Sequence, residues 1–132
     1  MALPPAAGRL LVGLGIDSVD ISRLAQMLER RRSMAERLFT PGERSYAARL
    51  RNPAPSLAAR FAAKEATMKA LGVGLGALDL TDVDVRRSGV GPPSLHVTGR
   101  GGSLAASLGV TGWMVSLTHT ETVASAVVAA LG

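Results

Sequence analysis

One segment carries most of the side chains that are suited to chemistry. Apolar residues recur at helical spacing over residues 56–71, which predicts a helix with one narrow apolar stripe. Lys64 falls in the middle of that stripe, where its ammonium must reach the edge or meet an anion, because an unpaired buried charge is costly. Arg60 lies one turn away, and Glu65 and Lys69 lie one turn apart on the other flank. One carboxylate and up to three cations are what a metal ion and a polyphosphate require, although Glu65 and Lys69 also fit an ordinary surface salt bridge.

A magnesium site of this kind needs a second carboxylate, and Asp17 is the best candidate. It follows the apolar run over residues 10–16, which we interpret as a buried strand whose glycines allow close backbone approach. Asp17 also fits the N-cap of the next helix, and Asp20 competes with it for both roles. His119 lies between two expected strands, where it is either a ligand-binding side chain or a simply exposed one.

The residue types exclude several other kinds of site. The chain has no cysteine, so it has no disulfide, thiolate metal site or cysteine nucleophile. The phosphate-binding, zinc-protease and serine-hydrolase motifs are absent. The glycine-rich stretch over residues 72–76 follows a helix, so it is not a dinucleotide-binding turn.

Composition and charge are typical of a small basic domain. The chain has 132 residues, of which 47% are hydrophobic and 3% aromatic, so one domain with an aliphatic core is expected. The net charge is +5, with many arginines between residues 23 and 51, which favours an acidic protein, a nucleic acid or a phosphate-bearing substrate as partner. A nucleic-acid-binding module is the weaker interpretation, because aromatic residues for base stacking do not alternate with these cations.

The order of predicted elements indicates an α+β fold, since helices occupy the first half and strands the second. Residues 1–8 are expected to be a flexible lead and residues 9–132 a single domain. Neither a signal peptide nor a membrane span is predicted, so a cytoplasmic location is expected. The first half of the chain is expected to contain a helix from Val19 to residues 30–32, a short helix over 33–39 and a helix opened by the capping box Thr40–Glu43. The helix over 56–71 is expected to be capped by Ser56 and to stop at Gly72. The second half is expected to contain a hairpin turning at 89–93, a short helix over 104–108, and strands over 113–117 and 123–131.

Four segments resemble the holo-[acyl-carrier-protein] synthase family, the small trimeric class of 4′-phosphopantetheinyl transferases. The most specific is RFAAKEATMKALG over residues 60–72. The others are GLGIDSVDISR over 13–23, LFTPGE over 38–43 and VSLTHTETVASAVV over 115–128. Their order and spacing cover nearly all of residues 10–131.

The resemblance implies a fold, an activity and an assembly. The fold is a small antiparallel sheet with helices on one face, in a homotrimer whose active sites lie between subunits. The activity is transfer of the 4′-phosphopantetheine arm of coenzyme A to a serine of an acidic apo acyl carrier protein, with release of 3′,5′-ADP. The product supports fatty acid synthesis, with polyketide synthesis as an alternative.

The resemblance also implies roles for individual residues. Asp17 and Glu65 ligate Mg²⁺, Glu65 is the base, and Lys69 stabilises charge on the transferring phosphate. The coenzyme A site contains Arg60, Lys64, Lys69, Gly72, His119 and Thr120. The carrier protein is bound by Arg23, Arg30, Arg31 and Arg37.

The chain departs from the family pattern in the central hairpin. Relatives often have a basic residue where this chain has Pro92. If that residue contacts the cofactor, then another residue such as Arg86, Arg87 or Arg100 must replace it, or the affinity for the cofactor falls. A Mg²⁺-dependent phosphohydrolase that uses the same two carboxylates remains a rival interpretation.

Overall fold

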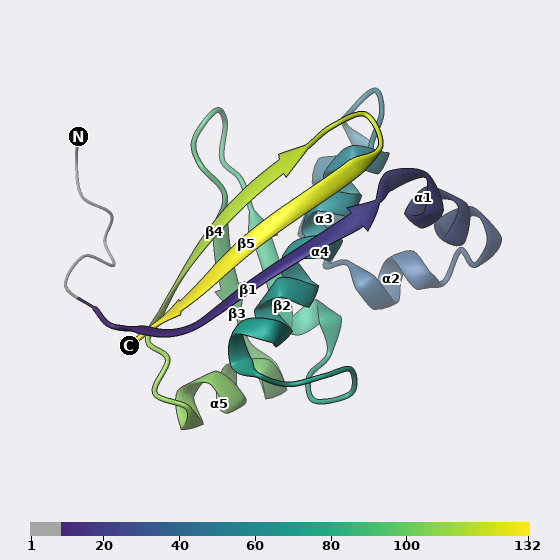
Figure 1. Cartoon of the computed structure of the whole chain (residues 1–132). Coiled ribbons are helices and arrows are strands. Elements are labelled where there is room, and N and C mark those ends of the chain that lie inside the picture. Colours follow the sequence, from purple (N-terminus) through teal and green to yellow (C-terminus); the bar gives the residue numbers. More distant parts are fainter. Residues whose placement is uncertain (1–8) are drawn as a thin grey trace.

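The computed structural model describes residues 9–132, so the lead predicted over residues 1–8 lies outside the described residues. Two antiparallel sheets form: a three-stranded sheet with strand order β1-β5-β4 and a two-stranded sheet of β2 and β3 (Figure 1). The element order is β1 (Leu11–Asp20), α1 (Ile21–Arg30), α2 (Met34–Leu38), α3 (Pro41–Ala48), α4 (Ala54–Leu71), a 3-10 turn η1 (Leu80–Asp82), β2 (Val83–Arg86), β3 (Ser94–Val97), α5 (Gly99–Ser107), β4 (Gly112–His119) and β5 (Val123–Leu131).

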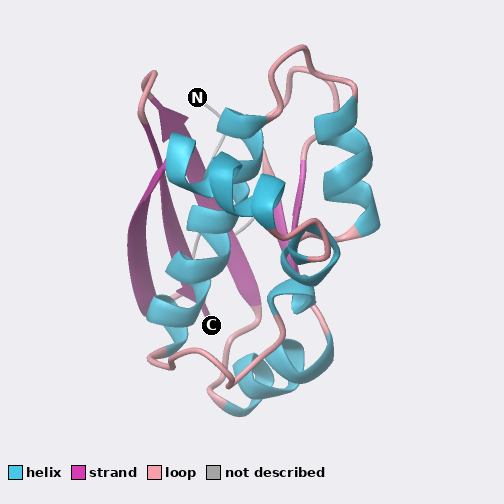
Figure 2. Ribbon diagram, turned by 90° about the vertical axis from the view of Figure 1, so that its right-hand side faces the viewer, coloured by secondary structure: helices cyan, strands magenta, loops and turns pink. Residues whose placement is uncertain are grey.

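All helices lie on one side of the three-stranded sheet, as Figure 2 shows. The long helix α4 packs directly on that face and forms the centre of the core. The opposite face of the sheet is not covered by any described element and exposes large apolar side chains. The predicted α+β class, with a small antiparallel sheet and helices on one face, is therefore confirmed.

The first strand is longer than the sequence predicted. It continues through Asp17 to Asp20, because Val19 still packs inward while Ser18 and Asp20 face outward in strand alternation. The helix begins at Ile21 rather than at Val19, which agrees with the alternative prediction that Asp20 caps it. Asp20 is the N-cap, since its side chain accepts a hydrogen bond from the Arg23 amide at 3.0 Å. Asp17 is therefore not a cap.

Two helix starts illustrate how capping residues behave in this chain. The capping box of α3 is confirmed, because the Thr40 hydroxyl accepts from the Glu43 amide and Glu43 accepts from the Thr40 amide. Ser56 was wrongly predicted as the cap of α4, which begins at Ala54 with Pro53 before it and no side-chain cap. Gly72 ends α4 with a positive φ of 72°, as predicted.

The remaining elements agree with the sequence analysis except in the length of α5. The hairpin of β2 and β3 and the two final strands form as expected. Helix α5 begins at Gly99 rather than near Leu104, so it includes a glycine-rich stretch that helix propensity disfavours.

Helix α4 is buried almost all round rather than along one stripe. Its alanines are small enough to allow the sheet, α1 and α3 to pack against different sides of it. The closest contact is with β1, where a Cβ added to Gly13 would lie 1.9 Å from the Ala70 carbonyl oxygen. At Gly15 the corresponding distance to the Ala66 carbonyl oxygen is 1.8 Å. The predicted close backbone approach of these glycines is therefore present, and it sets the spacing between β1 and α4.

A buried ion pair connects α4 to α3 and β2. The Lys64 ammonium lies 2.7 Å from Glu43 Oε1, and both side chains are 0% exposed. Lys64 also donates to the backbone carbonyls of Leu80 and Val83. The other Glu43 oxygen accepts from the Val85 amide at 3.0 Å. Each charge is therefore satisfied within the fold, as burial requires.

This pair corrects the predicted role of Lys64 in coenzyme A binding. The sequence correctly indicated that Lys64 needs an anionic partner, but that partner is Glu43 and not a ligand. Because Lys64 is fully buried, its ammonium is not available to a phosphate at the surface. Burial lowers the pKa of Lys64, and the Glu43 carboxylate opposes this effect.

We expect Gly15→Ala to destabilise the fold by at least about 3 kcal/mol, because the new methyl group overlaps a backbone carbonyl that cannot move alone. Urea denaturation at fixed protein concentration measures the effect. Gly42→Ala in the first turn of α3 is the control, since its Cβ would meet nothing closer than 3.9 Å. The control is expected to be neutral or to gain up to about 1 kcal/mol. Equal stability of the two variants would contradict the close contact.

We expect Lys64→Met to destabilise the protein by about 3–5 kcal/mol, because it leaves the Glu43 carboxylate buried without its cation. Adding Glu43→Gln should recover part of this loss, since the double variant buries no net charge. Denaturant midpoints of the wild type, both single variants and the double variant give the coupling between the two residues. Additive losses, or a Lys64→Met midpoint equal to that of the wild type, would contradict a structural role for the pair.

Candidate active site

Asp17 is placed by β1 and oriented by α4. It lies opposite Ala126 of β5, on the sheet face that packs against α4, and its side chain is 17% exposed. Lys69 of α4 donates to Asp17 Oδ1 and to the Ile16 carbonyl, both at 3.0 Å. The carboxylate is therefore held in a fixed position at the surface of the helix–sheet contact.

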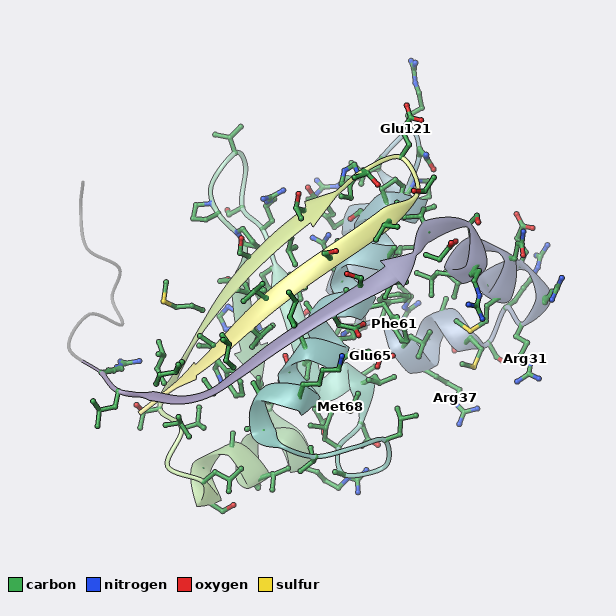
Figure 3. All side chains as sticks on the ribbon, viewed as in Figure 1. Arg31, Arg37, Phe61, Glu65, Met68 and Glu121 are labelled. Atoms are coloured by element: carbon green, nitrogen blue, oxygen red, sulfur yellow. The ribbon has the colours of Figure 1, made fainter. Side chains whose placement is uncertain are left out.

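Glu65 lies on α4, one turn before Lys69, and lines the same pocket as Asp17. This carboxylate pocket, of about 400 Å³, lies between β1, α1 and α4. Burial raises the pKa of Glu65 above its ordinary 4.5, the negative charge of Asp17 raises it further, and Lys69 opposes the rise. Figure 3 shows Phe61 and Glu65 beside β1, on the side of α1 and α2. The complete lining is Asp17, Ser18, Val19, Asp20, Arg23, Leu24, Met27, Phe61 and Glu65.

The carboxylate pocket fits a hard divalent cation. Two carboxylates that repel each other across one pocket are stabilised by a shared positive charge, and oxygen is the ligand atom that Mg²⁺ prefers. Within residues 9–132, no group of three or more acidic or histidine side chains is placed to hold a metal ion. The chain therefore offers two carboxylate ligands, which leaves coordination positions for water and phosphate oxygens.

A second pocket, here called the arginine pocket, lies between α3, α4 and the end of β4. It measures about 330 Å³. Arg60 is only 4% exposed there, with Nη1 donating to Ser56 Oγ at 2.6 Å and its guanidinium 4.4 Å from the centre of the Tyr46 ring. Its Nε has no hydrogen-bond partner among the described residues. The pocket is lined by Tyr46, Leu50, Asn52, Pro55, Ser56, Ala59, Arg60, Arg87, Leu117, Thr118 and His119.

The remaining residues of the expected coenzyme A site lie at element ends. His119 lines the arginine pocket, and its Nδ1 donates to the Thr120 carbonyl at 3.0 Å. The Thr120 hydroxyl accepts from the amides of Thr122 and Val123, so it stabilises the turn between β4 and β5. Gly72 ends α4 and lines neither the carboxylate pocket nor the arginine pocket.

The arginines expected to bind a carrier protein are split between two places. Arg23 lines the carboxylate pocket, beside the apolar side chains of Leu24 and Met27. Arg31 and Arg37 are exposed at the α1–α2 end of the molecule, where Figure 3 shows both pointing outward. Arg30 is exposed in the last turn of α1.

The structure brings some predicted site residues together and separates others. Asp17, Glu65 and Lys69 form one cluster. Arg60 and His119 belong to the arginine pocket, which shares no lining residue with the carboxylate pocket. The two pockets lie on either side of β5, because Asp17 is in β1 and His119 is in β4.

Sequence reasoning missed two members of these constellations. Tyr46 packs on Arg60, and helical spacing alone gives no signal for a contact between α3 and α4. Glu43 was identified only as part of a capping box, although a carboxylate there was also able to pair with Lys64.

The family model and the similar proteins all point to the same family. The model of the 4′-phosphopantetheinyl transferase superfamily matches residues 13–128. A holo-[acyl-carrier-protein] synthase of Streptomyces avermitilis is 48% identical over 122 residues, which cover 92% of this chain and 98% of that protein. The synthase of Moorella thermoacetica is 45% identical over 113 residues, covering 86% and 88% of the two chains.

A solved structure agrees in fold as well as in sequence. The holo-(acyl-carrier-protein) synthase of Bacillus anthracis, in complex with coenzyme A (3′,5′-ADP), superposes with a TM-score of 0.77 at 31% identity. The match covers 92% of this chain and 97% of that one. The chain belongs to the holo-[acyl-carrier-protein] synthase family of the 4′-phosphopantetheinyl transferase superfamily.

Proposed function

We propose that this protein transfers the 4′-phosphopantetheine arm of coenzyme A to a serine of an apo acyl carrier protein. The observation that carries the proposal is that Asp17 and Glu65 line one pocket, with Lys69 paired to Asp17, in a chain that belongs to this family. Two carboxylates and an ammonium supply what phosphoryl transfer needs, namely a metal site and a cation beside the transferring group.

Each residue of the cluster has a defined task in this reaction. Asp17 and Glu65 would hold Mg²⁺, which when bound supplies positive charge to the pyrophosphate of coenzyme A. Glu65 accepts the proton of the carrier serine, and its raised pKa makes it a stronger base than an ordinary carboxylate. The serine oxygen bonds to the β-phosphorus as the pyrophosphate P–O bond breaks, and 3′,5′-ADP leaves. Lys69 offsets the negative charge on the phosphate and the leaving group.

The carrier protein is proposed to bind on the α1–α2 side of the carboxylate pocket. Arg23 lines that pocket beside Leu24 and Met27, so a cation and an apolar surface lie next to the proposed base. Arg30, Arg31 and Arg37 extend this basic surface outward. Exposed cations of this kind mainly set the encounter rate and orientation of an acidic partner.

The uncovered face of the three-stranded sheet supports the proposed homotrimer. Leu14 and Ile16 of β1 are 60% and 62% exposed in the single chain. Met114 of β4 and Val127 of β5 are exposed on the same face, in register with them. An apolar sheet face of this kind is typical of a surface that packs against another subunit.

The separation of the two pockets supports active sites shared between subunits. A single chain does not bring the arginine pocket to the carboxylate pocket, although both are proposed to contact one coenzyme A molecule. In a closed ring, the carboxylate pocket of one subunit meets the arginine pocket of its neighbour.

The cellular setting follows from the same proposal. None of the helices in residues 9–132 has the length and apolar character needed to cross a membrane. We place the enzyme in the cytoplasm, where it supplies holo carrier protein for fatty acid synthesis.

We expect Glu65→Gln to lower the transfer rate by at least about 100-fold, because it removes the base and one metal ligand. Intact mass of an apo carrier protein, incubated with coenzyme A and Mg²⁺, reports the added phosphopantetheine. A Glu65→Gln variant with wild-type turnover would contradict the assignment.

The melting temperature of Glu65→Gln shows whether the variant is folded. Because the pKa of Glu65 is raised in the folded state, its ionisation destabilises the apo protein as pH rises above 4.5. Glu65→Gln should therefore melt at or above the wild-type temperature at pH 7, with the difference vanishing below pH 4.5.

We expect two inactive variants to restore each other in mixed trimers. Asp17→Asn and His119→Ala damage different pockets, so a site that draws one pocket from each kind of subunit is intact. Co-expressed subunits that mix at random should regain about a quarter of the wild-type sites, because each site samples two subunits. Separately purified variants mixed without exchange are the control. If verified mixed trimers do not regain transfer, then each active site takes both of its pockets from the same chain.

A further inference from the structure

Lys69 is held beside the carboxylate pocket by two oxygen atoms of β1. Its ammonium lies 3.0 Å from Asp17 Oδ1 and also donates to the Ile16 carbonyl at 3.0 Å. The Lys69 side chain is nevertheless 55% exposed, whereas the Asp17 side chain is 17% exposed. A long, flexible and half-exposed side chain is therefore fixed against a carboxylate that is proposed to bind the metal ion.

The charge of Lys69 acts on both carboxylates of this pocket. Lys69 follows Glu65 by one turn on α4, and its positive charge opposes the rise in the pKa of Glu65 that burial and Asp17 cause. Glu65 forms no salt bridge with any residue in the range 9–132. Arg23 also lines the pocket, but within that range it is paired with neither carboxylate. Lys69 is therefore the cation of the described chain that compensates these two negative charges most directly.

A divalent cation that binds the same carboxylates would meet this ammonium. Because the two oxygens of one carboxylate are neighbours, a metal ion on Asp17 and the ammonium paired with Oδ1 would repel each other. The Ile16 carbonyl alone does not compensate the charge of Lys69. The phosphates of coenzyme A offer the ammonium new anionic oxygens, and its flexible stem allows it to turn towards them.

We infer that Lys69 competes with the divalent metal ion for Asp17, and that it leaves Asp17 for the phosphate when the metal and coenzyme A bind together. This inference rests on the proposed function, in which Asp17 and Glu65 bind Mg²⁺ beside the pyrophosphate. It follows that the metal binds weakly without coenzyme A. Each of the two ligands then strengthens the binding of the other, because such coupling is reciprocal.

Binding of Mn²⁺ to the purified protein, measured from the EPR signal of the free ion, tests the inference. Without coenzyme A, Lys69→Gln should bind Mn²⁺ about tenfold more tightly than the wild type, because the ammonium no longer competes. With saturating coenzyme A this advantage should disappear, since the wild-type ammonium has then moved to the phosphate. Lys69→Arg, which keeps a cation beside Asp17, should retain the weak binding of the wild type without coenzyme A.

Arg23→Gln is the matched control for a general effect of charge. It removes one positive charge from the lining of the same pocket without breaking a pair with Asp17. Because Arg23 is exposed, its charge is screened by solvent and salt, so this control should change the Mn²⁺ affinity by less than about twofold.

Lysine is rare enough in this chain for a direct measurement of the exchange. The sequence contains only Lys64 and Lys69, and Lys64 is 0% exposed in its pair with Glu43. In protein that carries isotope-labelled lysine, the two side-chain NMR signals are assigned with the Lys69→Gln variant. Saturating Mg²⁺ should shift the Cε signal of Lys69 and leave the Cε signal of Lys64 in place.

The inference is overturned if the wild type and Lys69→Gln bind Mn²⁺ equally well without coenzyme A, or if Arg23→Gln gains as much as Lys69→Gln. A Lys69 signal that does not move while the metal binds would also overturn it, because the ammonium and the metal would then share Asp17. If neither protein binds Mn²⁺, the metal site and the competition are both refuted. These measurements need no carrier protein, so an enzyme that shows the exchange but modifies no carrier would refute the proposed transfer alone.

Discussion

The close contact between β1 and α4 is the constraint on which the site depends. Gly13 and Gly15 have no side chain, so the carbonyl groups of α4 lie where a Cβ would otherwise be. This spacing continues two residues further along β1 to Asp17, which it places within 3.0 Å of the Lys69 ammonium and in the same pocket as Glu65. A bulkier strand would hold the helix away from the sheet and separate the two carboxylates. The glycines, which weaken a strand by themselves, therefore act as part of the active-site architecture.

Helix α4 presents charged residues to three different surroundings. Lys64 faces the interior and pairs with Glu43, which fixes the helix to α3 and β2. The next residue, Glu65, faces the carboxylate pocket, while Arg60 faces the arginine pocket on the other side. Such an arrangement needs small residues where the sheet and two helices approach α4 closely, and seven of its 18 residues are alanine. The ion pair stabilises a packing in which Glu65 and Arg60 each line a pocket that a ligand can enter.

Much of the fold followed from local patterns, and the failures have a physical cause in each case. The capping box of α3, the glycine stop of α4 and the hairpin of β2 and β3 were predictable, because they depend on neighbouring residues. The end of β1 was misplaced, since Asp17 looks like a cap until Val19 is seen to pack inward in the same strand. Asp17, Glu65 and Lys69 were correctly grouped, but Lys64 was assigned to the ligand. Its partner Glu43 lies 21 residues earlier in sequence and meets it only through tertiary packing, which periodicity does not reveal.

We expect β1 and α4 to bring Asp17 and Glu65 of one chain to a single metal site. Anomalous diffraction from crystals grown with Mn²⁺ and coenzyme A tests it directly, because Mn²⁺ replaces Mg²⁺ at carboxylate sites and is visible by its scattering. We expect one Mn²⁺ peak per chain, within about 2.3 Å of an oxygen from each carboxylate and bound to the pyrophosphate. The arginine pocket nearest that peak should come from a neighbouring subunit. A peak that is bound by only one of the two carboxylates, or that lies elsewhere in the chain, would rule out a metal site shared by Asp17 and Glu65.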